Sequence, residues 1–231
     1  LALEEKWLSF KSDGFFQEQR NMVTLTSDEL EWVKNNPMVR IGTNVNWKPL
    51  EHIDDEGGVY GINPSVLELI EQRVPLRFKH VPFVSWQEQF SALVNGDIDI
   101  LASATQTEER DKYLLFSDSY WDMPWVVIHQ RQLGSQLKLS DFYGKSLAII
   151  KGYYLVSQIQ KEHPNIALIL VDTYQEGVQA LQQGLVEGVV ENIATASEIL
   201  RQESLITLGM SVVDDFNVDK NRFATKKDRA I

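Results

Sequence analysis

Short apolar runs alternate with amphipathic segments over the first half of the chain. The runs at residues 39–43, 76–81 and 98–102 predict strands, and the segments at 64–72 and 85–95 have the apolar spacing of helices. This order of strand, helix, strand, helix and strand is typical of an α/β unit built on a largely parallel sheet.

The same alternation returns in the second half without a repeat of the sequence. Strands are predicted at residues 146–150, 166–171 and 186–190, each followed by a helix, and residues 125–129 and 223–228 are predicted to be extended. Two such units, joined by extended crossings, place their strand ends face to face across a cleft. A cleft of this kind suits a small polar ligand and closure about a hinge.

These units give the expected division of the chain. Lobe 1 is predicted over residues 26–124 and lobe 2 over 125–212, and the chain is expected to return to lobe 1 over 213–231. Residues 1–25 do not resemble the rest, because they combine a short amphipathic helical pattern with a polar linker. The predicted fold class is therefore α/β with two lobes and an N-terminal helix and linker.

Composition narrows the classes of function. The 231 residues carry a formal net charge of −11, which argues against nucleic acid or an anionic membrane surface as a partner. The chain has no cysteine, which excludes thiolate chemistry, cysteine-ligated zinc and disulfides. Its four histidines lack the spacing of metal ligands, and no apolar run is long enough to span a membrane. We predict neither a metal nor a cofactor.

Residues 97–120 carry the pattern with the clearest chemistry. Ser103 and Thr105 stand where a buried strand should end, and Thr107 begins a helical turn that contains Arg110. Hydroxyls, free backbone N–H groups and a guanidinium at the carboxyl end of a strand can hold an anion such as a carboxylate. The alternative is that Arg110 pairs with a neighbouring acid and the threonines only cap the turn.

Further candidate ligand contacts lie after other predicted strands. Trp47 follows the first strand and could stack on a ligand, although a plain core position is the alternative. Trp86 lies on the apolar side of the helix predicted at 85–95. The strand ends of the second unit add a last group of candidates, which are Tyr153, Tyr154, Glu191 and Asn192.

From residue 39 to residue 228 the chain resembles the bacterial periplasmic solute-binding proteins that bind polar amino acids. The matching pieces are Ile41-Gly42-Thr43 with Trp47-Lys48-Pro49, Gly61-Ile62, Leu93 to Asp99, Thr107 to Arg110, Phe116-Ser117 with Tyr120, Leu139 with Gly144-Lys145 and Gly152, and Ala180 to Gly184 with Glu191-Asn192. The resemblance implies that Trp47 stacks on the ligand and that Ser103, Thr105 and Arg110 hold its carboxylate. It also implies a ligand contact at Tyr154 and an amine-binding role for the position of Asn192.

The chain departs from that pattern at several positions. Asn192 is uncharged where the family often has an aspartate, so an amine-binding ion pair would have to come from Glu191. Tyr153 and Tyr154 are bulkier than the usual small hydroxyl residue and would shrink or fill the cleft. The interval between the strand and Arg110 is one residue shorter than in many transport members.

These departures and the lead-in over residues 25–37 are more similar to the Venus-flytrap sensor modules of bacterial membrane receptors. Such modules precede histidine kinase or diguanylate cyclase domains. The resemblance implies a periplasmic module of an inner-membrane protein that binds an amino acid or small carboxylate, acts on signalling domains of the same chain and can form a homodimer. The helix at the front and the lack of a closing helix after Asp228 are interpreted as signs of a longer protein.

Three alternatives stay open at this point. One is a transport-type binding protein that delivers an amino acid to a permease. Another is an enzyme on the same scaffold, such as a dehydratase or a lytic-transglycosylase lobe pair. Its acid would be Glu51 or Glu191, although we expect Glu51 to lie at the solvated surface. The third is a module whose degenerate cleft works only through protein contacts.

Overall fold

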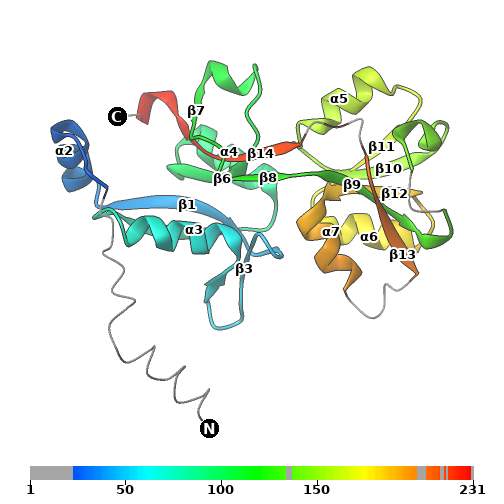
Figure 1. Cartoon of the computed structure of the whole chain (residues 1–231), viewed down its shortest axis with the longest axis horizontal. Coiled ribbons are helices and arrows are strands. Elements are labelled where there is room, and N and C mark those ends of the chain that lie inside the picture. Colours follow the sequence, from blue (N-terminus) through cyan, green and yellow to red (C-terminus); the bar gives the residue numbers. More distant parts are fainter. Residues whose placement is uncertain (1–22, 134–136, 202–206, 214–215, 217, 230–231) are drawn as a thin grey trace, which may run out of the picture.

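The computed structural model describes residues 23–133, 137–201, 207–213, 216 and 218–229. The helix predicted near the N-terminus lies outside the described residues. The described chain forms two α/β lobes side by side. It crosses from the first lobe to the second before strand β9 (Trp125–Gln130) and has returned to the first lobe at strand β14 (Asp219–Lys226) (Figure 1). This arrangement is the two-lobed architecture that the sequence predicts.

Lobe 1 is built on a mixed sheet with the strand order β5-β1-β6-β14-β7. Strand β1 pairs in parallel with β5 and β6, and β14 runs antiparallel to β6, β7 and β8. The strands are β1 (Met38–Asn44), β5 (Arg77–Phe83), β6 (Ile100–Ala104), β7 (Leu114–Phe116), β8 (Trp121–Met123) and β14 (Asp219–Lys226). A small sheet beside them consists of β2 (Asn46–Trp47), β3 (Glu51–Ile53) and β4 (Val59–Tyr60).

Lobe 2 has a five-stranded sheet with the order β11-β10-β12-β9-β13. Strand β10 pairs in parallel with β11 and β12, and β9 is antiparallel to both β12 and β13. The strands are β9 (Trp125–Gln130), β10 (Ser146–Ile150), β11 (Ala167–Val171), β12 (Gly188–Asn192) and β13 (Leu208–Val212). No strand is shared between this sheet and that of lobe 1 within the described residues.

The helices begin and end where local side chains favour it. Lobe 1 has α2 (Ser27–Asn35), α3 (Ile62–Glu71) and α4 (Trp86–Asn95), and lobe 2 has α5 (Leu155–Glu162), α6 (Tyr174–Gln182) and α7 (Ile193–Leu200). Thr26 and Glu29 form the predicted capping box of α2. Gly96 ends α4 with φ 83°, a left-handed conformation that favours glycine. Four 3₁₀ turns complete the described elements, at Arg110–Lys112 (η1), Arg131–Leu133, Leu139–Phe142 and Lys227–Arg229.

Several element boundaries differ from the sequence prediction, and three of these differences concern elements that reach the boundary between the lobes. Helix α3 begins at Ile62 rather than residue 64, because the N–H groups of Ile62 and Asn63 bond to the carbonyls of Pro49 and Leu50. Strand β6 begins at Ile100, because its pairing with β1 begins with Ile41 opposite Ile100. Strand β14 begins at Asp219, four residues earlier than predicted, because its first residues pair with β8. All three differences arise from contacts with distant parts of the chain.

A single cluster of buried apolar side chains extends from one lobe into the other. It includes Leu93 and Leu101 in lobe 1 and Leu147 and Ile149 in lobe 2, and aromatic residues at the boundary connect these parts. The lobes therefore bury apolar surface against each other, which stabilises their contact. Among the described helices, none is both long and apolar enough to cross a bilayer.

Gly188 in β12 provides a test of this packing. An alanine Cβ at this position would come within 2.6 Å of the Val127 side chain and 2.9 Å of the Leu147 side chain. We predict that Gly188→Ala lowers the free energy of unfolding by about 1–3 kcal/mol through overpacking, measured by urea denaturation. Gly209→Ala on β13 is the control, because its nearest neighbour would be 3.6 Å away. Equal losses in the two variants would contradict the described packing of lobe 2.

Candidate functional site

Arg110 lies at the boundary between the lobes and is only 8% exposed. Its backbone N–H donates to the Thr107 hydroxyl, as the predicted cap requires. The guanidinium donates to the carbonyl of Thr105 at 2.7 Å and, across the boundary, to the carbonyl of Gly152 in lobe 2 at 3.0 Å. Its planar group also lies 4.8 Å from the centre of the Trp86 ring, within cation–π range. Arg110 therefore joins the two lobes.

The alternative role for Arg110, pairing with a neighbouring acid, is not observed. None of the ion pairs among the described residues includes Arg110. Burial lowers the pKa of its guanidinium, and charges that include Asp219 oppose that effect. A buried guanidinium bonded only to neutral carbonyls can accept an anionic partner.

The two hydroxyls predicted to hold a ligand are engaged by other protein groups. The Thr105 hydroxyl donates to the Asp219 carboxylate at 2.5 Å. The Ser103 hydroxyl bonds to the amide of Asn63, and the Ser103 N–H donates to the hydroxyl of Tyr120 at 3.0 Å. Ser103 has φ 52°, which is unusual for a residue other than glycine, and this network holds it there.

Glu51 belongs to the same hydrogen-bond network, because Asn63 bonds to both Glu51 and Ser103, and it is not at the surface. It is 2% exposed and accepts hydrogen bonds from the Asn44 N–H, the Asn63 amide and the Gln89 amide. The expectation of a solvated Glu51 was wrong, because three donors from separate elements surround its carboxylate. Burial raises the pKa of Glu51 to about 7.

Tyr153 fills the space between the lobes. Its side chain is 7% exposed and lies edge-on to Trp86 and Trp125, with ring centres 6.3 and 5.2 Å apart. The Trp47 ring is 6.4 Å away on a third side. The neighbouring Tyr154 points its hydroxyl to the Trp125 indole N–H at 3.1 Å. The bulk of Tyr153 thus occupies the cleft, as its departure from the family pattern suggested.

Glu191 and Asn192 lie beneath Tyr153 at the end of β12. Glu191 is fully buried and accepts hydrogen bonds from the backbone and amide of Asn192 at 2.8 and 2.6 Å. The Tyr153 hydroxyl lies 3.4 Å from each of its oxygens. Asn192 also caps α7 by accepting from the Thr195 N–H. Burial raises the pKa of Glu191 to about 8, so this carboxyl is largely protonated at neutral pH.

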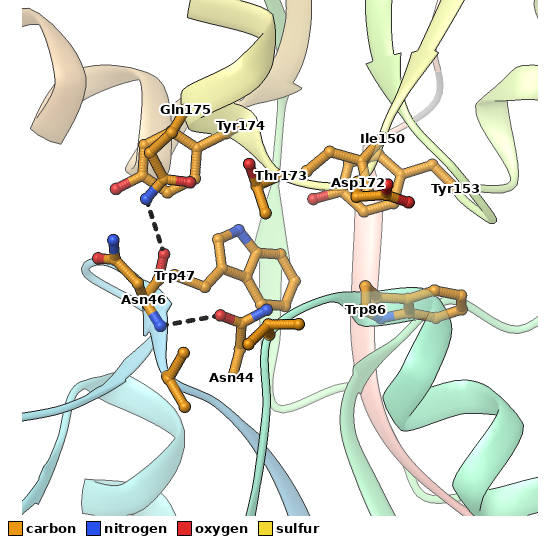
Figure 2. Close-up of a pocket in the computed structure, with 12 residues that line it drawn as sticks. Asn44, Asn46, Trp47, Trp86, Ile150, Tyr153, Asp172, Thr173, Tyr174 and Gln175 are labelled. Carbon is orange, nitrogen blue, oxygen red and sulfur yellow. Dashed lines mark hydrogen bonds between the residues drawn. The ribbon is translucent and has the colours of Figure 1, made fainter.

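Three cavities are lined in part by Tyr153. A wide one of about 1060 Å³ also has Arg110, Gly152 and residues of α5 in its lining, and the other two lie on either side of the Tyr153 ring and share Trp47. The inner one has a volume of about 20 Å³, room for one water. Its lining includes Tyr153 and seven more of the predicted residues, which are Trp47, Trp86, Ser103, Thr105, Arg110, Tyr154 and Asn192. The outer one, here called the mouth pocket, has about 290 Å³ and is lined by both lobes. Figure 2 shows it between Trp47 and Trp86 on one side and Ile150, Tyr153 and Tyr174 on the other.

Tyr153, Trp47 and Trp86 line both cavities and form the wall between them. The mouth pocket is bridged by one further contact between the lobes, from the Gln175 amide to the Asn46 carbonyl at 3.1 Å (Figure 2). Movement of the Tyr153 ring would therefore join the two cavities into one cleft that reaches Arg110.

Two buried donors in the cleft lining have no acceptor. Among the described residues, the buried side-chain nitrogen and oxygen atoms without a hydrogen bond are Trp47 Nε1, His52 Nδ1 and Asn221 Nδ2. Trp47 lines both cavities and Asn221 lines the inner one. Figure 2 shows the Trp47 indole nitrogen turned toward Thr173 across the mouth pocket. An unpaired buried donor is costly, so these two atoms indicate where an acceptor would be stabilised.

The residues that shape the cleft and that the sequence prediction missed include Asn63, Tyr120, Trp125, Asp219 and Asn221. Trp125 was taken only as part of a crossing strand. Asp219 lies in a polar stretch whose pattern predicts no element, and it reaches the cleft because β14 begins there. Burial raises the pKa of Asp219 to about 6. Across the described ranges, no group of three or more His, Asp or Glu side chains is arranged to hold a metal ion.

This geometry defines a class of protein, in which two α/β lobes enclose a cleft at the ends of their strands. The chain belongs to the bacterial extracellular solute-binding proteins, family 3, whose model matches residues 39–202. This finding agrees with the resemblance seen in the sequence.

Similar proteins include both sensors and transport proteins. The chain is 24% identical over 188 residues to the sensor protein EvgS of Escherichia coli, covering 81% of this chain and 15% of EvgS. It is 25% identical over 197 residues to a probable histidine-binding protein of Neisseria gonorrhoeae, covering 81% of this chain and 71% of that protein. The chain thus spans only a small part of the length of EvgS.

Solved structures show the same fold. The periplasmic domain of BvgS from B. pertussis superposes with a TM-score of 0.80 at 20% identity, covering 90% of this chain and 40% of that one. The arginine-binding protein ArgBP from T. maritima, in the form of its P235GK mutant, superposes with a TM-score of 0.73 at 22% identity, covering 87% and 86%. At these identities the likeness establishes the fold alone.

The buried acids predict how stability depends on pH. The folded pKa values of Glu51 and Glu191, about 7 and about 8, lie above the ordinary value of 4.5. Between pH 6.5 and 8 the unfolded chain has already released these protons while the folded chain still holds them. Stability therefore falls as pH rises through this window and levels off above it. Burial lowers the pKa values of His52 and His80 from 6.5 in the folded chain, so their contribution to stability rises with pH and is nearly complete once the unfolded histidines have lost their protons, early in the window.

The midpoint of thermal unfolding should thus decrease from pH 6.5 to pH 8, measured by circular dichroism. Glu191→Gln keeps the acceptor for Asn192 but removes the titrating group, so its profile should be flatter. Glu68→Gln changes an exposed carboxylate on α3 and should retain the wild-type profile. A midpoint that rises across this window would contradict the assignment.

Proposed function

We propose that the chain is the extracytoplasmic sensing module of a bacterial transmembrane receptor. Its lobes would open and close about the segments of chain that cross between them and so change the state of signalling domains in the same protein. The ligand would be an amino acid or a similar small carboxylate bound between the lobes. A periplasmic location and a possible homodimer are parts of the same proposal.

The observation that carries this proposal is a buried guanidinium beside two unpaired buried donors in the cleft lining. Arg110 is buried and bonds to the neutral carbonyls of Thr105 and Gly152 without an ion pair, and Trp47 Nε1 and Asn221 Nδ2 lack acceptors. A small ligand could supply acceptors to the two unpaired donors, and an anionic group would suit the guanidinium. A ligand of this kind would place its carboxylate at Arg110 and its remaining atoms in the mouth pocket.

A ligand that occupies the inner cavity and the mouth pocket together requires movement of Tyr153. The inner cavity of about 20 Å³ cannot hold a carboxylic acid together with the tyrosine ring. The ligand would displace the ring and break the bond between Arg110 and the Gly152 carbonyl, so binding and lobe movement would be coupled. A sensing module needs coupling of this kind. A ligand shifts the equilibrium between two arrangements of the lobes only if it binds one arrangement more tightly than the other.

The similarity to EvgS and to the periplasmic domain of BvgS supports a receptor context for this chain. A transport-type binding protein is the second candidate, favoured by the match to a probable histidine-binding protein over most of that protein's length. The contents of the cleft favour the sensor, because a transport protein must bind and release its cargo, and here Tyr153 occupies the space that the cargo would take.

An enzyme on this scaffold has less support. The chain matches the membrane-bound lytic murein transglycosylase F of Shewanella oneidensis at 24% identity over 145 residues, 30% of that protein. Glu51 and Glu191 have the raised pKa values of general acids, but both lie inside the protein away from the cavity linings described above. A general acid must reach its substrate within hydrogen-bond distance.

Replacement of Tyr153 tests the proposed ligand class. Tyr153→Ser removes the wall between the two cavities and should lower stability by about 3–5 kcal/mol, the cost of deleting a large buried ring. A thermal-shift screen with amino acids and small carboxylates should then detect binding more readily than in the wild type. In the same background, Arg110→Ala should weaken binding of the best ligand about ten- to a hundredfold, measured by calorimetry. Unchanged affinity would contradict the role of Arg110.

The sensing role is tested separately in the intact receptor that contains this module. Tyr153→Ser and Arg110→Ala should both change its basal output, read by a reporter gene, because each removes a contact between the lobes. Arg73→Ala is the control, since Arg73 is exposed and its side chain hydrogen-bonds only to the carbonyl of Leu69 among the described residues. If neither cleft variant altered the output, the proposed sensing role would be wrong.

A further inference from the structure

An acidic side chain of the protein lies where the cleft is equipped for an external carboxylate. Asp219, the first residue of β14, is only 5% exposed and lines the inner cavity beside Arg110 and Thr105. It enters from the return segment between the lobes, where its backbone pairs with Met123 of β8. No other described acid lines this cavity.

Asp219 bonds to one of the groups that the sequence pattern assigns to a ligand and lies near another. Its carboxylate accepts the Thr105 hydroxyl at 2.5 Å, a distance typical of a strong bond to a charged acceptor. Asp219 and Arg110 are not in direct contact, but each favours the charged form of the other. The charge of the buried guanidinium is thus partly balanced from within the chain.

The geometry points to Asp219 as a tethered competitor that sets the affinity of the cleft for carboxylates. A side chain held at the site has an effective concentration of about millimolar or more, so a free acid must exceed that level or bring further contacts. Asp219 would weaken the binding of simple carboxylates and favour ligands that also make contacts in the mouth pocket. This inference deepens the proposed function, because it names what determines ligand choice at the same cleft.

Deletion and chemical rescue test the inference on the isolated protein. Asp219→Ala removes a carboxylate group of the size of formate and leaves Thr105 and Arg110 in place. We expect sodium formate to raise the midpoint of thermal unfolding of this variant by about 2–4 °C over sodium chloride at equal ionic strength. The wild type should show no difference between the two salts, because its own carboxylate holds the position.

Two further variants define the rescue. Asp97→Ala removes an exposed aspartate before β6 and should show no formate-specific shift. Adding Arg110→Met to Asp219→Ala should abolish the shift, since the guanidinium would no longer attract the anion. If Asp219→Ala does not fold, Asp219→Ser is tested in the same way, because serine is small and can still bond to Thr105.

The outcomes separate this inference from the sensing role. A formate-specific shift confined to the Asp219 variants and dependent on Arg110 supports the tethered competitor. Equal shifts in all variants, or none in either Asp219 variant, overturn it. Rescue on the isolated protein together with an unresponsive receptor would leave Asp219 as the competitor and refute only the sensing role.

Discussion

The bond from the Arg110 guanidinium to the Gly152 carbonyl, with Tyr153 packed beside it, joins two lobes whose sheets share no strand in the described chain. A second side-chain hydrogen bond across the boundary runs from the Gln175 amide to the Asn46 carbonyl, but it lies at the exposed surface. The apolar cluster at the boundary also holds the lobes together, but hydrophobic contact is not directional and does not fix their relative orientation. Arg110 and Tyr153 therefore fix how far apart the lobes lie and what space remains for a ligand.

A cleft filled by its own side chains changes what a ligand must do. In a cleft with open space, a ligand adds contacts between the lobes and favours closure. Here the protein already supplies a ring, a carboxylate and a cross-lobe hydrogen bond, through Tyr153, Asp219 and Arg110. A ligand can then act only by replacing these groups, so its effect depends on the difference between two sets of contacts. A receptor module with this arrangement would be near one end of its equilibrium before any ligand binds.

The sequence predicted the fold well, because the apolar periodicity of each strand and helix is local information. Caps such as Thr26, Ser85 and Thr173 lie at the helix starts they favour. The cleft was predicted only in part. Arg110 and Tyr153 were predicted as cleft residues because they follow strands. Tyr153 is also larger than the residue usual at this position in the family. Asp219 and Tyr120 were missed, since each reaches the cleft through pairing with residues more than 15 positions away, which no local pattern encodes.

The distance between the lobes tests the central claim most directly. The chain has no cysteine, so Lys79→Cys in lobe 1 and Gln182→Cys in lobe 2 can carry spin labels for pulsed electron paramagnetic resonance. With no ligand added, the wild type should give one narrow distance distribution, and Arg110→Met combined with Tyr153→Ser should give a broader and longer one. A broad distribution in the wild type, unchanged by the two substitutions, would contradict the account.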